Sequence, residues 1–173
     1  MLRHERTIPM HINFRPLRPS DESFLWEMLY LAFYVPPGKP PFPRAILHEP
    51  DIACYVQGWG RPGDWGLMAN TGETNVGAIW LRQWSGEERG YGYVNPDIPE
   101  LSIALLPEYR NKGLGTRMLK KVISMAKGRF PGLSLSVMEI SPARRLYERL
   151  GFQKVGQIMD SLVMLLEWSK REP

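Results

Sequence analysis

The sequence has few cysteines and histidines, the residues that form disulfides and most often bind zinc. Its 173 residues include one cysteine, Cys54, and three histidines that lack the spacing of zinc ligands. A single cysteine cannot form an internal disulfide. We therefore expect no metal site and no disulfide framework. We interpret Cys54 as a small thiol packed among apolar neighbours rather than as a nucleophile.

Long hydrophobic runs are also missing. No apolar stretch approaches the ~20 residues needed to cross a bilayer, and the first ten residues have no apolar core of a signal peptide. We therefore expect no membrane partner and a cytoplasmic protein. Residues 1–10 are predicted to form a flexible N-terminal extension, and residues 11–170 a single domain.

The composition is that of a globular protein, with 43% apolar and 23% charged residues. The net charge of +4 favours an anionic ligand, and by itself it leaves both a nucleotide cofactor and a nucleic acid open. A nucleic acid could use the basic residues in and just after the third predicted helix, which are Lys120, Lys121, Lys127 and Arg129. This run is more typical of the solvated face of an amphipathic helix, so we expect no nucleic-acid partner.

Hydrophobic periodicity predicts an α+β fold in which a mixed sheet carries helices on its faces. The proline-rich segment 35–43 excludes a helix there, because proline lacks the amide hydrogen that a helix needs. Helices are predicted at 21–33, 50–57, 113–128 and 142–150, and strands at 11–17, 65–69, 76–84, 100–106, 133–139, 152–157 and 162–168.

The turn after the strand 100–106 has the composition of an anion-binding site. Gly113 and Gly115 lack Cβ atoms, so successive backbone amides and the start of the next helix can approach a ligand closely. Arg110 and Lys112 add positive charge that suits a pyrophosphate. The alternative is that both glycines only allow a tight connection between strand and helix.

Two other nucleotide-binding motifs do not fit this turn. A dinucleotide-binding motif would need a third glycine where the sequence has Met118. A P-loop would end in Gly-Lys-Ser/Thr, whereas this turn continues as Gly115-Thr116-Arg117.

A second informative segment covers residues 141–152. Ser141 is a suitable N-cap, Pro142 fits a first helical turn, and Gly151 can end the helix before the next strand. Taken alone, Tyr147 within this helix would be interpreted as a core aromatic residue that packs against its apolar neighbours.

Together, the two segments resemble the GNAT superfamily of acyl-CoA-dependent N-acetyltransferases. The stretch from Arg110 to Gly115 matches the R/Q-x-x-G-x-G/A cofactor motif, and the stretch from Ala143 to Phe152 matches the later A-x-x-x-Y-x-x-x-G-F pattern. Ser141 stands where the family usually has asparagine, which weakens the expectation of a side-chain contact with the cofactor at that position.

The resemblance implies a GNAT-like, α/β sandwich-like fold with a mostly antiparallel sheet of six to seven strands and helices on both faces. The strands 100–106 and 133–139 would splay apart at a bulge, and the exposed backbone edge would bind the pantetheine arm of acetyl-CoA. The implied cofactor-binding residues are Ile103, Ala104, Leu105, Arg110, Asn111, Lys112, Gly113, Leu114, Gly115, Thr116, Ser141 and Arg144.

The resemblance also implies an enzyme that transfers an acetyl group to a primary amine by direct attack. A backbone amide near Leu105 would hold the oxyanion, and Tyr147 would protonate the departing CoA thiolate. Glu100 is the candidate base, with Glu139 as the alternative; Glu100 could instead be a strand-edge residue facing solvent. A different hypothesis is a CoA-binding sensor or interaction module without catalysis.

The acceptor amine and the oligomeric state, monomer or homodimer, are not specified by these patterns. Aromatic residues in the first part of the chain could form an acceptor pocket or belong to the core. They are Phe33, Tyr34, Phe42, Trp59, Trp65, Tyr91 and Tyr93.

Overall fold

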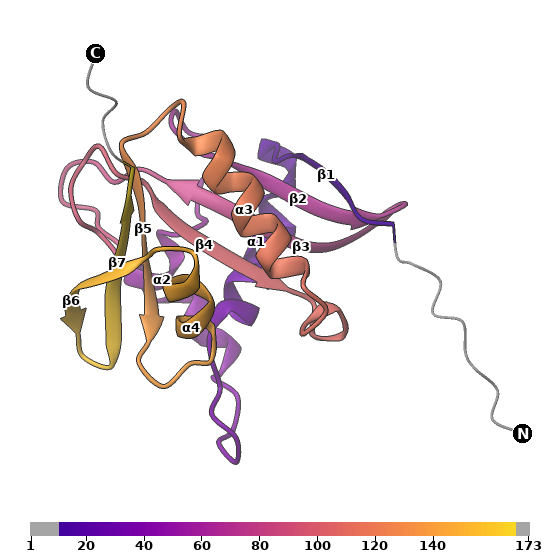
Figure 1. The fold of residues 1–173 in the computed structure, drawn as a ribbon. Coiled ribbons are helices and arrows are strands. Elements are labelled where there is room, and N and C mark those ends of the chain that lie inside the picture. Colours follow the sequence, from indigo (N-terminus) through magenta and orange to yellow (C-terminus); the bar gives the residue numbers. More distant parts are fainter. Residues whose placement is uncertain (1–10, 169–173) are drawn as a thin grey trace, which may run out of the picture.

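The computed structural model describes residues 11–168, so the predicted N-terminal extension and the last two residues of the predicted domain lie outside the described residues. A seven-stranded sheet in the order β1-β2-β3-β4-β5-β7-β6 forms the centre of the protein (Figure 1). Only β4 and β5 run parallel, and every other neighbouring pair is antiparallel. The predicted mixed, mostly antiparallel sheet is confirmed.

The elements follow the predicted order. The strands are β1 (Asn13–Pro16), β2 (Trp65–Thr71), β3 (Thr74–Arg82), β4 (Glu100–Leu105), β5 (Gly132–Met138), β6 (Gln153–Ile158) and β7 (Ser161–Glu167). The α-helices are α1 (Glu22–Ala32), α2 (Pro50–Ala53), α3 (Leu114–Ala126) and α4 (Ala143–Arg149). Three short 3-10 helices, η1 (Pro19–Asp21), η2 (Arg44–His48) and η3 (Pro107–Tyr109), complete the set.

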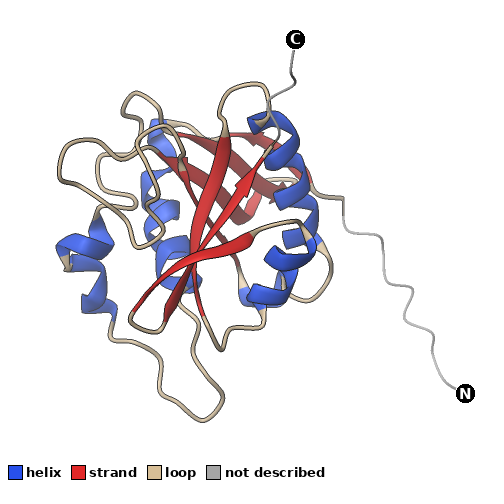
Figure 2. Ribbon diagram, turned by 60° about the vertical axis from the view of Figure 1, so that its left-hand side comes forward, coloured by secondary structure: helices blue, strands red, loops and turns tan. Residues whose placement is uncertain are grey.

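Helices cover both faces of the sheet (Figures 1 and 2). Alternate residues of each strand point to opposite faces, so the sheet supports two separate apolar clusters. The cluster under α3 and α4 contains Met118, Leu135 and Phe152, whereas the cluster under α1 and α2 contains Met28 and Trp80. Within residues 11–168 no helix has the length and apolarity of a membrane span.

The second predicted helix is wrong in length, because α2 ends at Ala53 rather than at Gln57. The guanidinium of Arg82 donates hydrogen bonds to the carbonyl oxygens of Cys54 and Gln57, both at 2.8 Å. The Cys54 carbonyl that a continuing helix would use is thus bonded to a side chain. Sequence periodicity also missed η2, because five residues are too few to show it.

The parallel strands β4 and β5 separate almost at once. They share a single register pair, Glu100 with Ser134, next to a 3.1 Å bond from the Ser134 amide to the Pro99 carbonyl. Beyond this point β4 continues along β3, whereas β5 follows β7 over its whole length. The predicted splay is therefore present.

The predicted bulge in β4 is wrong. The register between β3 and β4 runs without a shift from the pair Gly77 and Leu105 to the pair Arg82 and Glu100. The gap arises because each strand stays with its antiparallel partner, so that the two halves of the twisted sheet diverge.

Candidate active site

A cavity of about 550 Å³ opens at the split between β4 and β5. Its walls come from both faces of the sheet: Glu100 and Tyr55 on one side, and Val137 and Tyr147 on the other. The two catalytic candidates from the sequence, Glu100 and Tyr147, therefore border one space although they lie far apart in the chain.

The edge of β4 that faces the gap carries unpaired backbone groups. The Leu106 amide donates to the Val76 carbonyl at 2.9 Å, which fixes the side of β4 that faces β3. Because backbone polar groups alternate along a strand, the amides of Ile103 and Leu105 point into the gap. Ala104 differs from the prediction: its backbone faces β3, and its side chain packs in the cluster under α1.

Glu100 is buried, with 2% of its surface exposed, so the alternative of a solvent-facing strand edge is wrong. Its Oε1 accepts hydrogen bonds from the Gly92 amide at 2.8 Å and from Trp84 Nε1 at 3.2 Å. Burial raises the pKa of this carboxyl to about 7, although hydrogen bonds from Tyr55, Trp84 and Gly92 oppose the shift. A carboxylate of this kind can accept a proton near neutral pH.

Glu139, the alternative base, does not border the cavity of Glu100 and Tyr147. Its side chain is half exposed and lies 3.9 Å from Arg144. The structure thus favours Glu100 over Glu139 as the group that can exchange a proton inside the cavity.

Tyr147 projects from α4 and is 9% exposed. Its ring packs edge-on against Phe152 with centroids 5.9 Å apart, so it is a core residue as well as a cavity residue. Burial raises the pKa of its hydroxyl to about 12, because a phenolate would be poorly solvated there. The hydroxyl therefore keeps its proton at neutral pH and remains available as a donor.

The turn before α3 has the backbone conformation that its glycines suggested. Asn111 and Gly113 both have positive φ, 59° and 81°, and Gly113 is the N-cap of α3 without a side-chain hydrogen bond. The tight-connection interpretation accounts for Gly113. It does not account for Gly115, where an added Cβ would meet only Leu105 Cδ1, at 3.9 Å. The missing side chain at Gly115 leaves open space beside the first amides of α3.

The remaining residues predicted to bind the cofactor differ in their exposure and in their contacts. Lys112 is exposed on the turn, and Leu114 is buried below it. The Arg110 guanidinium donates to the Leu31 carbonyl at 3.1 Å, so its charge lies at the end of α1 rather than over the amides of the turn.

Ser141 and Arg144 lie on the other side of the gap, at the start of α4. Helix α4 begins at Ala143, one residue later than expected, and Ser141 Oγ accepts a 3.3 Å bond from the Ala143 amide. Arg144 pairs with Glu148 at 2.7 Å. The Ser141 side chain is thus occupied by a helix-start contact while it also borders the main cavity.

Several polar cavity residues were not identified as functional candidates from the sequence, among them Glu49, Asp51, Tyr55, Ser136 and Asp160. Of the aromatic residues considered for an acceptor pocket, Phe33, Tyr34, Phe42 and Tyr91 line the cavity, and Trp59, Trp65 and Tyr93 do not. A sequence signal for Tyr55 was absent, because a single tyrosine in a short apolar helix is typical of core packing. Among the described residues, no group of three or more metal-ligating side chains gathers.

Comparisons with known proteins agree with this arrangement. Residues 24–152 match the model of the acetyltransferase (GNAT) family. No curated protein matches the sequence.

Solved structures with the same fold include three acetyltransferases. The PaiA N-acetyltransferase of Thermoplasma acidophilum, solved with coenzyme A, has a TM-score of 0.65 at 19% identity and covers 92% of this chain and 100% of its own. YncA of Salmonella typhimurium, solved with acetyl-CoA, has a TM-score of 0.63 at 17% identity and covers 94% of this chain and 96% of its own. A GNAT-family acetyltransferase of Streptococcus pneumoniae has a TM-score of 0.61 at 17% identity and covers 91% of this chain and 100% of its own. At these identities the likeness concerns the fold.

Proposed function

The chain belongs to the acetyltransferase (GNAT) family, and from this premise we propose that it transfers the acetyl group of acetyl-CoA to a primary amine by direct attack. The observation that carries the proposal is the shared cavity, in which a buried carboxyl and a buried phenol face one space from opposite faces of the sheet. One group can accept a proton at neutral pH and the other can donate one.

The backbone supports a position for acetyl-CoA. The amides of Ile103 and Leu105 face the gap between β4 and β5, where the pantetheine arm can bond to them as an added strand does. The amides from Asn111 to Thr116 and the start of α3 suit the diphosphate. Two relatives in fold, PaiA and YncA, were solved with coenzyme A and acetyl-CoA, which is consistent with this assignment.

The reaction then needs three proton transfers. Glu100 takes a proton from the ammonium form of the acceptor, and the neutral nitrogen forms a bond to the thioester carbonyl carbon. The Leu105 amide holds the oxyanion while the C–S bond breaks. Tyr147 gives its proton to the departing thiolate, and the nitrogen, which still carries an extra proton after the attack, returns a proton to the tyrosinate. The products are an acetylated amine and free CoA thiol. No covalent acyl-enzyme is needed.

A thiol-release assay with acetyl-CoA and a panel of amines tests this function. Calorimetry of CoA binding, run in parallel, separates the alternatives. CoA binding together with amine-dependent thiol release supports transfer, whereas CoA binding without release for any amine would indicate a sensor or interaction module.

A further inference from the structure

The charges on the cavity wall are all of one sign. Four carboxylates border the cavity, Glu49, Asp51, Glu100 and Asp160, and no lysine, arginine or histidine among the described residues does so. The chain as a whole has a net charge of +4. The sign of the cavity is therefore opposite to that of the protein.

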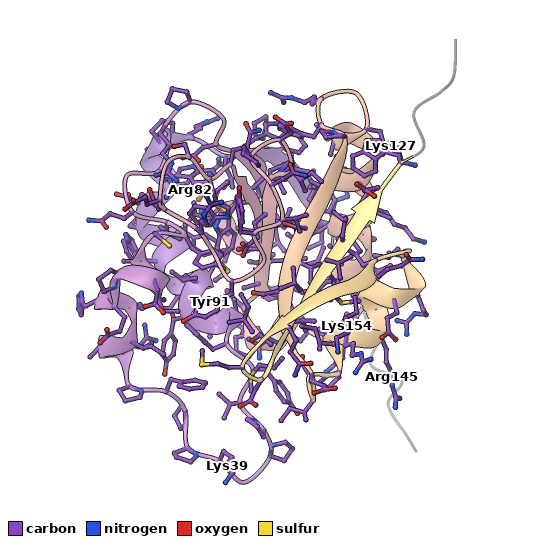
Figure 3. All side chains as sticks on the ribbon, turned by 90° about the vertical axis from the view of Figure 1, so that its left-hand side faces the viewer. Lys39, Arg82, Tyr91, Lys127, Arg145 and Lys154 are labelled. Atoms are coloured by element: carbon purple, nitrogen blue, oxygen red, sulfur yellow. The ribbon has the colours of Figure 1, made fainter. Side chains whose placement is uncertain are left out.

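These carboxylates are not neutralised by the protein itself. In residues 11–168, none of the four makes an ion pair, whereas carboxylates elsewhere, such as Asp21, Glu27 and Asp64, do. The basic residue of the proline-rich loop, Lys39, lies at the tip of that loop, away from Tyr91 (Figure 3). A ligand that carries a cation would complement the charge of this wall.

Hydrogen bonds through Tyr91 set the separation between the carboxylates of Asp51 and Glu100. The Tyr91 hydroxyl donates to the Asp51 carboxylate, and the Tyr91 amide donates to the Tyr55 hydroxyl at 2.7 Å. The amide of the next residue, Gly92, donates to Glu100 Oε1 at 2.8 Å. The backbone end of Tyr91 thus lies near Glu100 and its hydroxyl end at Asp51, so the two carboxylates are separated by about the length of one tyrosine.

Apolar side chains also line this cavity. Phe33 at the end of α1 and Phe42 of the proline-rich loop pack with ring centroids 5.3 Å apart, and Ile46 lies beside them on the wall. The loop is held to α1 by a 2.7 Å bond from the Tyr30 hydroxyl to the Phe42 carbonyl. The aromatic faces can pack against an apolar group and also attract a nearby cation.

We propose, on the basis of the function above, that the acceptor is a small amine whose apolar body carries a second cationic group. The reacting nitrogen lies near Glu100, the apolar body packs against Phe33 and Phe42, and the second cation pairs with Asp51. An acceptor with a carboxylate in place of the second cation would meet Asp51, Glu49 and Asp160 and be repelled.

Three probes with the same body test this charge selection: para-xylylenediamine, para-methylbenzylamine and para-aminomethylbenzoate. Their binding to the CoA-saturated protein is measured by calorimetry, and their acetylation by thiol release. We expect the diamine to have the highest affinity and kcat/KM and the benzoate the lowest, each step being about two- to fivefold, because Glu49, Asp51 and Asp160 are exposed and exposed ion pairs are weak. Added salt should narrow the differences.

Asp51→Asn removes the charge but keeps an oxygen that can accept the bond from Tyr91. It should reduce the preference for the diamine over the monoamine about two- to fivefold. The matched control is Glu73→Gln, which removes an exposed carboxylate in the turn between β2 and β3 and should leave the preference unchanged.

The outcomes separate this inference from the function on which it rests. Equal affinities and rates for the three probes, or an unchanged preference in Asp51→Asn, would overturn the charge selection while transfer to amines stands. Selective binding of the diamine that depends on Asp51, without thiol release from any probe, would support the charge selection and overturn the transfer function.

Discussion

Arg82 and Glu100 lie directly opposite each other in the register of β3 and β4, yet the arginine is bonded elsewhere. Its guanidinium donates to both carboxylate oxygens of Asp64, at 3.0 and 2.8 Å, and to two carbonyls of the segment after α2. Residues directly opposite in a sheet normally interact. Asp64 thus holds a neighbouring cation away from Glu100, which is consistent with the raised pKa of that carboxyl.

The first prediction concerns this ion pair. Arg82 and Asp64 have side chains only 1% and 2% exposed, and removing one partner of such a pair leaves an uncompensated buried charge. Asp64→Asn should therefore lower the free energy of unfolding by about 3–5 kcal/mol in urea denaturation. The control is Glu88→Gln, which breaks the surface pair with Arg61 and should cost less than about 1 kcal/mol. Equal losses in the two variants would contradict a structural role for the buried pair.

The second prediction follows from the raised pKa of Glu100. The folded state binds a proton more tightly than the unfolded chain, with a pKa of about 7 against 4.5, so the folded state loses stability as pH rises through this window. Glu100→Gln removes this loss. The Trp84 indole and the Gly92 amide both donate to Oε1, an oxygen that glutamine keeps.

Glu100→Gln should therefore exceed the wild type in stability by up to about 3 kcal/mol at pH 8, and by little at pH 4.5. Thermal or urea unfolding across this pH range measures the difference. A stability difference that stays constant from pH 4.5 to pH 8 would show that the carboxyl is not perturbed by burial.

The third prediction uses the same group in catalysis. If Glu100 accepts the proton of the acceptor, kcat/KM of the wild type should rise with pH through an apparent pKa near 7. Glu100→Gln should lose this part of the profile and fall about 10²-fold or more at pH 7.5. An unchanged profile in the variant would assign the titration to the amine itself.

The fourth prediction separates catalysis from packing at Tyr147. Tyr147→Phe keeps the ring against Phe152 and removes only the hydroxyl. Turnover should fall about 10²-fold while the CoA dissociation constant and the melting temperature change little. The matched control is Tyr109→Phe, on the helix η3 and outside the cavity lining. Full turnover in Tyr147→Phe would remove the tyrosine from the mechanism.

The sequence predicted those parts of the fold that depend on local pattern. Apolar periodicity identified seven strands and placed α1, α3 and α4 to within a few residues, because each buries one continuous face. It failed at α2, where Arg82, about 28 residues away, takes the carbonyl that would continue the helix. A bond of this range leaves no periodic signal near Cys54.

The candidate site was predictable in the same limited way. Gly113, Gly115 and Tyr147 belong to short motifs and were found, whereas the bond between Asp51 and Tyr91 joins residues 40 positions apart. The burial of Glu100 was also not predictable. It depends on the segment between β3 and β4, which places Gly92 and Trp84 over the carboxyl by folding back on the sheet.

The fifth prediction tests the turn before α3 through two opposite effects of one methyl group. In Gly115→Ala the new Cβ meets no protein atom closer than 3.9 Å, and alanine favours the helix, so the free energy of unfolding should rise by up to about 1 kcal/mol. The same methyl group fills the space beside the first amides of α3. If the diphosphate of CoA lies there, CoA affinity should fall about tenfold or more, as measured by calorimetry.

Gly128→Ala is the control for this change, because Gly128 also has open space around its Cβ position but lies just after the opposite end of α3. Its CoA affinity should equal that of the wild type. If Gly115→Ala is more stable and binds CoA with unchanged affinity, no part of CoA occupies the space beside Gly115. The diphosphate would then have to bind elsewhere. A lower CoA affinity together with a higher free energy of unfolding cannot be explained by damage to the fold. A substitution that stabilises the protein can weaken binding only by occupying the space of the ligand or by changing its contacts.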